Sequence, residues 1–378
     1  MNNKRVLVFS DYFYPAYKAG GPIRSITNLT CLLQRKVSFS VVSSNTDLDN
    51  KALSSVEPNS WLPMINGTSA YYSSDNGNII KVLRGLDLKN FDCIYLNSFF
   101  SFSFSILVML YLRFIGYKGG ILLAPRGEVT TGALKKGWIK KKVYLSVFKI
   151  LFRRLNITFH FTSPEEAHDG LKYLGRSIKY IDIPNMHEKI EDVRPLDKEV
   201  RCLNLTYLSR VTEKKNLKTV LNSLLKLGDD ITVKFKIAGE VDSAEYWEEC
   251  KDLFKSMPKN VTVEYLGPLG RNESINLLMS SHAFILPTFN ENFGHAIVEA
   301  GLSGCIPIIS NQTPWSDVKN HGGYALECLD VDGFTEAIYE IANYSSQEFE
   351  SSRINSQLYF KKKLDGNAKK IEVMFDVI

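Results

Sequence analysis

The chain has 378 residues, which is more than a single hydrophobic core usually serves, so two domains are expected. Its hydrophobic content of 44% and charged content of 23% are ordinary for a soluble globular enzyme. The six cysteines are scattered without a C-x-x-C pair, which argues against disulfides or a zinc site and indicates reduced thiols in a cytosolic protein. The first residues run straight into a strand, and their apolar stretch is too short for a signal peptide, so secretion is not expected.

Charge is distributed unevenly along the chain. Residues 1–190 hold 25 Lys and Arg against 13 Asp and Glu, a net charge of +12, whereas the remainder has a net charge of −7. Such a split indicates two halves with different partners, and we expect the basic half to face something anionic.

Strand-like apolar runs alternate with helical stretches along the whole chain. The runs are residues 6–9, 39–43, 93–96, 121–124, 158–161 and 179–183, then 203–208, 233–238, 261–266, 283–286 and 306–309. This alternation predicts an α/β protein with one parallel sheet in each half and helices on both faces. A polar segment without a periodic apolar face separates the halves. The expected parts are a first domain (1–185), a linker (186–200), a second domain (201–357) and a C-terminal helix (358–378).

One apolar stretch, residues 99–115, resembles a membrane span. It is short for that purpose, contains three serines and Arg113, and is soon followed by another apolar run. We therefore predict a buried crossover helix.

The most informative segment is residues 287–310. A buried strand ends at Leu286, and a helix is expected from His295, so Glu291 lies in the connecting loop and Glu299 in the helix. The backbone N–H groups of residues 292–295 then lie at the helix N-terminus, where they favour electron-rich oxygens. Two carboxylates beside these amides suit a polyhydroxylated ligand that carries phosphate. For an isolated pair of glutamates at this spacing, two surface carboxylates would be the commoner explanation.

The surrounding pattern resembles the donor-site signature of retaining glycosyltransferases of family 4. The matching residues are Glu291, Phe293, Gly294, Glu299 and Ala300, followed by the turn at 301–304 and the strand at 306–309. The resemblance implies the GT-B fold, in which two Rossmann-like doubly wound domains face each other across a cleft, and a C-terminal helix that crosses back to the first domain. It also implies that Glu299 binds the ribose of a nucleotide sugar and that Glu291 binds the hexose. The amides of Asn292, Phe293, Gly294 and His295 would help to hold the donor.

A second motif lies in residues 207–217, after the first strand of the second domain. It resembles the family pattern G-R-x-x-x-x-K, with Ser209 in place of the glycine. By this resemblance Arg210 and Lys215 are the ligands of the donor diphosphate. Cations at this position stabilise the charge that develops on the leaving group. A solvated basic loop is the alternative.

Weaker signals complete the predicted donor site. Gly20 and Gly21 lie between the first strand and a helix, where the family places a glycine-rich loop against the donor phosphates. Gly239 and Leu266 end strands of the second domain and would lie near the nucleobase. No G-x-G-x-x-G follows a strand, which argues against a dinucleotide cofactor.

The acceptor side departs from the family pattern. Where many members have a histidine, residues 123–128 read LAPRGE, as in a subgroup of exopolysaccharide and O-antigen transferases. Arg126 is the acceptor-side candidate. Three roles remain open for it: binding the donor phosphates, binding an anionic acceptor, or forming a structural ion pair.

Two D-x-D sequences, at 47–49 and 330–332, match the metal motif of the other glycosyltransferase fold. Neither follows a suitable buried strand end. We expect neither a metal ion nor another cofactor, because Arg210 and Lys215 can neutralise the diphosphate.

The segment 138–154 predicts a basic amphipathic helix. The expected core stripe is Ile139, Val143, Val147, Ile150 and Leu151. The expected membrane face holds Trp138, Lys141, Lys142, Leu145, Lys149, Phe152 and Arg153. A helix buried on both sides, with lysines reaching out to solvent, is the alternative, and a nucleic-acid surface is disfavoured.

These features favour an enzyme that transfers a hexose from a nucleotide-diphosphate sugar, with retention of configuration, to a lipid-linked saccharide of a surface polysaccharide. It would act in the cytoplasm, peripherally on the inner face of the cytoplasmic membrane. The family resemblance implies that the acceptor hydroxyl attacks from the side of the leaving group, without a protein nucleophile. A nucleotide-sugar 2-epimerase and a catalytically silent scaffold of an assembly complex are the alternatives.

Overall fold

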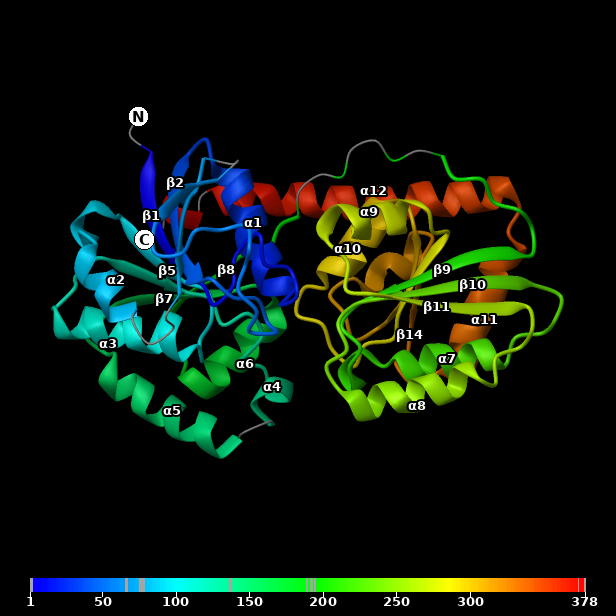
Figure 1. The fold of residues 1–378 in the computed structure, drawn as a ribbon, viewed down its shortest axis with the longest axis horizontal. Coiled ribbons are helices and arrows are strands. Elements are labelled where there is room, and N and C mark those ends of the chain that lie inside the picture. The colour runs from blue at the N-terminus through cyan, green and yellow to red at the C-terminus, as the bar shows by residue number, and fades with distance from the viewer. Residues whose placement is uncertain are drawn as a thin grey trace. The chain divides into compact units, whose positions relative to one another are not determined.

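The computed structural model describes residues 3–64, 67–74, 79–135, 138–187, 190, 193, 195–372 and 374–376. The chain divides into two compact units. Unit 1 comprises Met1–Glu188 and Gly366–Ile378, and unit 2 comprises Lys189–Asp365. Each unit is built on one sheet with helices on both faces (Figure 1), which confirms the predicted α/β class.

Unit 1 has an eight-stranded sheet in the order β3-β4-β2-β1-β5-β6-β7-β8. Its strands are β1 (Lys4–Phe9), β2 (Val37–Ser44), β3 (Trp61–Pro63), β4 (Ser69–Ser73), β5 (Cys93–Leu96), β6 (Gly120–Leu123), β7 (Asn156–Phe161) and β8 (Lys179–Asp182). All pairs are parallel except β3 with β4. The six predicted strands are present, whereas the short edge strand β3 and its neighbour β4 were not predicted.

The helices of unit 1 pack against two hydrophobic clusters, one on each face of the sheet. They are α1 (Gly21–Leu33), α2 (Ile79–Gly85), α3 (Leu107–Phe114), α4 (Thr131–Lys135), α5 (Trp138–Leu151) and α6 (Pro164–Leu174), with the short helices η1 (Leu88–Asn90) and η2 (Phe102–Ile106). Alternate residues of β1 enter different clusters: Leu7 contributes to the cluster beneath α2, α3, α5 and α6, whereas Val8 contributes to the cluster beneath α1.

The apolar stretch 99–115 forms η2 and α3. Val108, Met109 and Leu112 are fully buried against unit 1, which confirms the predicted crossover helix. None of the helices in the described part of the chain is long and apolar enough to span a membrane.

The prediction of which face of α5 is buried was wrong. Leu145, Phe148 and Phe152 are the buried residues, with exposures of 6, 5 and 2%. Phe148 enters an aromatic cluster in which its ring centroid lies 5.0 Å from that of Phe99 and 5.9 Å from that of Phe159. This burial of large rings outweighs that of the smaller aliphatic residues on the opposite face.

The residues of the predicted membrane face therefore fall into a buried group and an exposed group. Leu145 and Phe152 belong to the core, and Lys141 is half-buried, with its Nζ donating to the Ala133 carbonyl oxygen at 2.6 Å. Trp138, Lys142, Lys149 and Arg153 are exposed. The residues predicted as a core stripe, Ile139, Val143, Val147, Ile150 and Leu151, lie at the surface instead.

Unit 2 has a six-stranded parallel sheet in the order β11-β10-β9-β12-β13-β14. Its strands are β9 (Cys202–Leu208), β10 (Thr232–Ala238), β11 (Val261–Gly267), β12 (Ala283–Leu286), β13 (Ile306–Ser310) and β14 (Tyr324–Leu326). The chain fills one side of the sheet from β9 to β11 and then crosses to fill the other side from β12 to β14. The neighbouring strands β9 and β12 thus mark the topological switch point, where open α/β sheets bind ligands.

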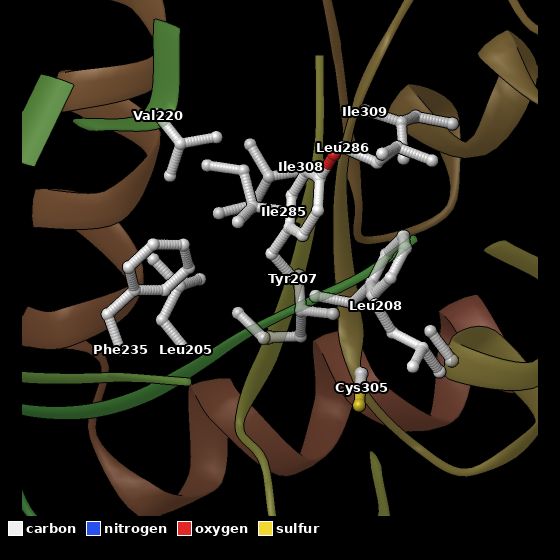
Figure 2. Close-up of a cluster of buried hydrophobic side chains, with 14 of the residues drawn as sticks. Leu205, Tyr207, Leu208, Val220, Phe235, Ile285, Leu286, Cys305, Ile308 and Ile309 are labelled. Atoms are coloured by element: carbon white, nitrogen blue, oxygen red, sulfur yellow. The ribbon is translucent and has the colours of Figure 1, made fainter. Parts of the chain in front are cut away.

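Helices cover both faces of this second sheet (Figure 1). They are α7 (Leu217–Leu225), α8 (Ala244–Phe254), α9 (Arg271–Met279), α10 (His295–Leu302), α11 (Val331–Asn343) and α12 (Ser346–Glu372), with the short helices η3 (Glu213–Lys215) and η4 (Ser316–Asn320). The end of α12, from Gly366, and the following short helix η5 (Met374–Asp376) belong to unit 1. Figure 2 shows the core between them, where Leu205 and Tyr207 of β9 lie close to Phe235 of β10 and Ile285 of β12. Such burial of strand side chains on both faces explains the near-continuous apolar runs of the sequence.

Helix α12 begins earlier than predicted. The polar stretch before residue 358 is already helical, because Phe349, Arg353, Ser356 and Phe360 form one buried face at spacings of four, three and four residues. Only two of these four residues are apolar, so the hydrophobic pattern alone did not show the face. Arg353 is neutralised there by Glu350, with Nη2 and Oε1 2.6 Å apart.

Candidate active site

An ion pair occupies the switch point of unit 2. Lys215, in η3 after β9, pairs through its Nζ with Oε1 of Glu291, which lies in the loop after β12. The two side chains are 15 and 13% exposed, so the pair is largely shielded but still reaches the surface. The two residues predicted to bind diphosphate and hexose are therefore in direct contact.

Hydrogen bonds from the Asn216 side chain and from the backbone hold these two loops together independently of the ion pair. Asn216 has a left-handed conformation with φ 55°, and its Nδ2 donates to the Pro287 carbonyl oxygen at 3.1 Å and to the Cys328 carbonyl oxygen at 2.7 Å. The Phe289 N–H donates to the Lys214 carbonyl oxygen at 2.9 Å. The loop after β9 is thereby joined to the loop after β12, which places the Lys215 and Glu291 side chains side by side.

The Glu291 loop is also supported by the segment after β13. The Glu291 N–H donates to the Gln312 carbonyl oxygen at 3.2 Å. Trp315 is 2% exposed, its Nε1 donates to the Phe293 carbonyl oxygen, and its ring meets the Phe293 ring edge-on at 5.5 Å. Neither Gln312 nor Trp315 was predicted from the sequence, because nothing in a single tryptophan 24 residues after Glu291 indicates that it supports that loop.

The start of α10 follows the predicted arrangement. Gly294 precedes the helix with φ 76°, and the backbone then enters α10 at His295. The His295 ring is buried and lies 4.6 Å from the Phe293 ring. Glu299 lies inside α10 and is fully buried, whereas Glu291 reaches the surface. The two glutamates thus have different surroundings although both belong to one motif.

Two further cations lie in the loop after β9. Arg210 pairs with Asp242 at 3.3 Å, and because both side chains are more than 40% exposed this pair contributes little to stability. Lys214, which the sequence analysis did not single out, has a pKa below its usual value because of desolvation and because of the neighbouring charge of Lys215. Three cations therefore lie within one loop at the carboxyl end of β9.

Gly239 is explained by packing. Its φ of 145° is disfavoured for other residues, and a Cβ would lie 1.9 Å from the Ser209 carbonyl oxygen. Its N–H donates to the Gly267 carbonyl oxygen at 2.9 Å, and its own carbonyl oxygen accepts from Tyr265 Oη at 2.9 Å. Leu266 is half-buried and packs against the unit 2 core. These contacts fix the carboxyl ends of β10 and β11.

Gly20 and Gly21 lie at the carboxyl end of β1 in unit 1. Gly20 has φ 68° and ψ −117° and caps α1, which Gly21 begins. Asp47 anchors the preceding loop: its Oδ2 accepts from the N–H groups of Tyr17 at 3.0 Å and Lys18 at 3.1 Å. Asp49 pairs with Lys18 Nζ at 2.8 Å. The first D-x-D sequence therefore stabilises the loop that carries the glycines.

Arg126 follows β6 at the same edge of the unit 1 sheet. Its Nε donates to Asn97 Oδ1 at 2.7 Å, its Nη2 donates to Tyr95 Oη at 2.6 Å, and its Nη1 donates to Asn185 Oδ1. All three acceptors are uncharged, so these bonds orient the guanidinium without neutralising it. They do not constitute the ion pair considered from the sequence.

The network continues from Arg126 to a buried histidine. The Tyr95 hydroxyl lies 2.9 Å from His160 Nδ1, and His160 Nε2 lies 2.7 Å from the Ile183 carbonyl oxygen. A carbonyl only accepts, so Nε2 carries the proton and Nδ1 accepts from Tyr95. Burial and the Arg126 charge lower the pKa of His160 to about 3.

Unit 1 also contains a carboxylate that was not predicted from the sequence. Asp11 follows β1, and its Oδ1 accepts from Ser101 Oγ at 2.7 Å. Burial raises its pKa above the usual value. Its position after the first strand was visible in the sequence, but a single aspartate in a loop carries no specific signal.

A family model identifies the segment that holds the ion pair. Residues 189–353 match the family described as "Glycosyl transferases group 1". Among curated proteins, the chain is 28% identical over 155 residues to the 2-deoxystreptamine N-acetyl-D-glucosaminyltransferase of Niallia circulans, covering 40% of this chain and 39% of that protein. It is 24% identical over 157 residues to the tRNA-queuosine alpha-mannosyltransferase of Drosophila melanogaster, covering 41% of this chain and 40% of that protein. The matches thus span about two fifths of each relative.

Solved structures match over the whole chain. Sucrose-phosphate synthase from Thermosynechococcus elongatus has a TM-score of 0.76 at 14% identity, covering 99% of this chain and 98% of that chain. Anabaena Alr3699/HepE in complex with UDP-glucose has a TM-score of 0.70 at 14% identity, covering 99 and 100% of the two chains. WaaG, a glycosyltransferase involved in lipopolysaccharide biosynthesis, has a TM-score of 0.65 at 12% identity, covering 98 and 99%. The protein therefore has the GT-B fold, and its residues 189–353 match the glycosyl transferases group 1 family model.

Proposed function

We propose that the protein transfers a hexose from a nucleotide-diphosphate sugar to a saccharide acceptor with retention of configuration. The observation that carries this proposal is the Lys215–Glu291 pair at the switch point of the segment that matches glycosyl transferases group 1. A cation and a carboxylate in contact are suited to the two ends of such a donor, because phosphate oxygens seek the cation and sugar hydroxyls donate to the carboxylate.

The donor would be bound mainly by unit 2. Arg210, Lys214 and Lys215 would surround the diphosphate, and Glu291 together with the amides of residues 292–295 would hold the hexose. Glu299 would bind the ribose diol, which requires its buried carboxylate to become accessible when the nucleotide enters. The structural similarity to a protein crystallised with UDP-glucose favours a uridine nucleotide.

In the proposed reaction the acceptor oxygen forms a bond to the anomeric carbon on the side from which the diphosphate departs. The bond between that carbon and the phosphate oxygen breaks, and its electron pair stays on the phosphate. The acceptor proton passes to a phosphate oxygen. Arg210, Lys214 and Lys215 stabilise the charge on the leaving group, which is the largest electrostatic requirement of this step.

In this proposal Glu291 accepts hydrogen bonds from hexose hydroxyls and forms no covalent intermediate. Its position beside the cations of the diphosphate site suits that role. We also propose that no metal ion is needed, because the cations of this loop can compensate for the diphosphate charge.

For the acceptor, we propose a lipid-linked saccharide of a surface polysaccharide. We expect this acceptor to carry an anionic group that Arg126 binds. The Arg126 guanidinium is held by three neutral hydrogen-bond acceptors, so its positive charge is not neutralised by them. The similarity to WaaG agrees with such a role. The enzyme would then act peripherally at the inner face of the cytoplasmic membrane.

The test begins with melting shifts in UDP-, GDP- and ADP-sugars, because a ligand at 100 times its dissociation constant adds about 2.7 kcal/mol of stability. The best donor is then incubated with saccharide acceptors, with and without EDTA. We expect product with the anomeric configuration of the donor, unchanged by EDTA. A product with inverted anomeric configuration would overturn retention. If EDTA abolishes activity and manganese restores it, the metal-free proposal is wrong. If the donor is converted to its 2-epimer without an acceptor, the protein is an epimerase.

A further inference from the structure

The outer face of α5 is apolar and exposed. Ile139, Val143, Val147 and Ile150 have exposures of 79, 60, 46 and 75%. Their spacings of four, four and three residues place them on one side of the helix, opposite the buried Phe148. We call these four residues the α5 stripe. In Figure 1 the helix runs along the lower rim of unit 1.

Basic residues border the α5 stripe on both sides. Lys140, Lys142, Lys149, Arg153 and Arg154 are all exposed. Between Glu128 and Glu165 the sequence contains eight Lys and Arg and no Asp or Glu. The helix therefore presents apolar side chains between cations, with no acidic residue of its own segment to neutralise them.

From these observations we propose that the α5 stripe and its flanking cations bind the surface of an anionic lipid bilayer. The aliphatic side chains would enter the boundary between headgroups and acyl chains, and the cations would meet lipid phosphates. Trp138, which is 40% exposed at the start of the helix with Lys142 Nζ 5.8 Å from its ring centroid, would lie at the headgroup level. The inference rests on the proposed function only in that a lipid-linked acceptor would lie at such a surface.

The charge pattern favours a bilayer over a second copy of the chain. A symmetric dimer brings the same patch onto itself, so five cations of one copy would face five of the other. Like charges at such a contact oppose association, whereas an anionic bilayer compensates all of them.

The test uses the full chain and vesicles of phosphatidylcholine alone or mixed with phosphatidylglycerol. The apolar variant carries Ile139→Gln, Val143→Gln and Ile150→Gln, which keeps helix propensity because glutamine is a good helix former. The charge variant carries Lys140→Glu, Lys142→Glu and Lys149→Glu. If the apolar variant does not fold, Ile139→Ala with Ile150→Ala replaces it.

Matched controls change unit 2 in the same way. The apolar control is Leu329→Gln, Ile354→Gln and Leu358→Gln, at residues that are 65, 41 and 56% exposed. The charge control is Lys259→Glu, Lys361→Glu and Lys362→Glu, all at exposed positions. Each control alters composition and net charge as much as its partner variant does.

We expect the wild type to sediment with anionic vesicles and far less with neutral ones, and binding to weaken as salt rises. Each surface lysine contributes about fivefold, so the charge variant should lose at least a hundredfold in partition coefficient. The apolar variant should lose at least tenfold and keep its salt dependence, and both controls should bind as wild type does.

Three outcomes would overturn the inference: equal binding to neutral and anionic vesicles, wild-type binding by the apolar variant, or a change in oligomeric state of the apolar variant without vesicles. The last would show that a second copy covers the stripe. The UDP-induced melting shift is measured on every variant, so a failure of membrane binding is distinguished from a failure of the proposed donor site.

Discussion

Lys215 and Glu291, which are 76 positions apart in the sequence, neutralise each other at the switch point of unit 2. In the proposed donor complex this contact would couple recognition of the diphosphate to recognition of the hexose. A diphosphate bound at Lys215 would compete with Glu291 for the ammonium group, and the carboxylate would then become available to the hexose hydroxyls. Binding of phosphate and binding of sugar would thus be linked, because Lys215 would exchange Glu291 for phosphate while Glu291 exchanges Lys215 for the hexose hydroxyls.

Replacing Glu291 with Gln should have opposite effects on nucleotide affinity and on turnover. Without the competing carboxylate, Lys215 is available to phosphate, so the affinity for UDP alone should rise severalfold in titration calorimetry. Turnover of the nucleotide sugar should nevertheless fall by roughly ten- to a hundredfold, because a charged hydrogen bond to the hexose is worth about 1.5 to 3 kcal/mol. Glu249→Gln, which removes the exposed partner of Lys218, is the control and should change neither property. A weaker affinity for UDP in Glu291→Gln would contradict the coupling.

Alanine at Arg210 should reduce turnover much more than stability, whereas alanine at Lys215 should reduce both, because it leaves the shielded Glu291 without its cation. Each loses a charge-assisted contact to the departing diphosphate, which corresponds to roughly a ten- to hundredfold loss in rate. Unfolding by urea should change little for Arg210→Ala, because its pair with Asp242 is exposed. Lys226→Ala, which removes an exposed pair with Asp332, is the matched control. Full activity in the double variant of Arg210 and Lys215 would refute the assignment.

Gly239→Ala should destabilise unit 2. The added Cβ meets the Ser209 carbonyl oxygen at 1.9 Å, so the backbone of β9 or β10 has to move. Overpacking of this kind costs about 1 to 3 kcal/mol, and the positive φ adds to it. Gly132→Ala in α4 has open space around its Cβ and should be neutral or slightly stabilising. Urea midpoints measure both changes, and equal midpoints would show that β9 and β10 adjust without cost.

The buried His160 should make unit 1 less stable as pH falls. Its folded pKa of about 3 lies below its unfolded value of about 6.5, so below pH 6.5 the unfolded chain binds a proton that the folded chain does not. The free energy of unfolding should therefore fall by up to about 1.4 kcal/mol per pH unit between those two values. Above pH 6.5 the residue contributes no slope.

His160→Gln isolates this contribution, because glutamine keeps a donor for the Ile183 carbonyl oxygen but does not titrate. The free energy of unfolding is measured at pH 7 and pH 5 for both proteins. The difference between them should shrink with acidification, even if the variant is less stable at pH 7. A constant difference would mean that His160 titrates equally in both states.

Much of the architecture could be predicted from the sequence. All eleven predicted apolar runs form strands, because a strand that is buried on both faces has a continuous apolar sequence. The short strands β3, β4 and β14 escaped prediction, since three to five half-polar residues carry no clear period. The placement of Arg210, Glu291 and Glu299 in loop, loop and helix also followed from local pattern alone.

What the sequence determined by itself is therefore local: the period of each segment, the loop that follows each strand, and the charges those loops carry. The tertiary structure decided which distant groups meet and which faces are buried. Lys215 reaches Glu291 only because β9 and β12 become neighbours in the sheet. Helix α5 has apolar residues on two sides, and only the aromatic cluster around Phe148 determines which side enters the core. Periodicity defines a face of a helix, but burial depends on the partner that the rest of the chain brings to it.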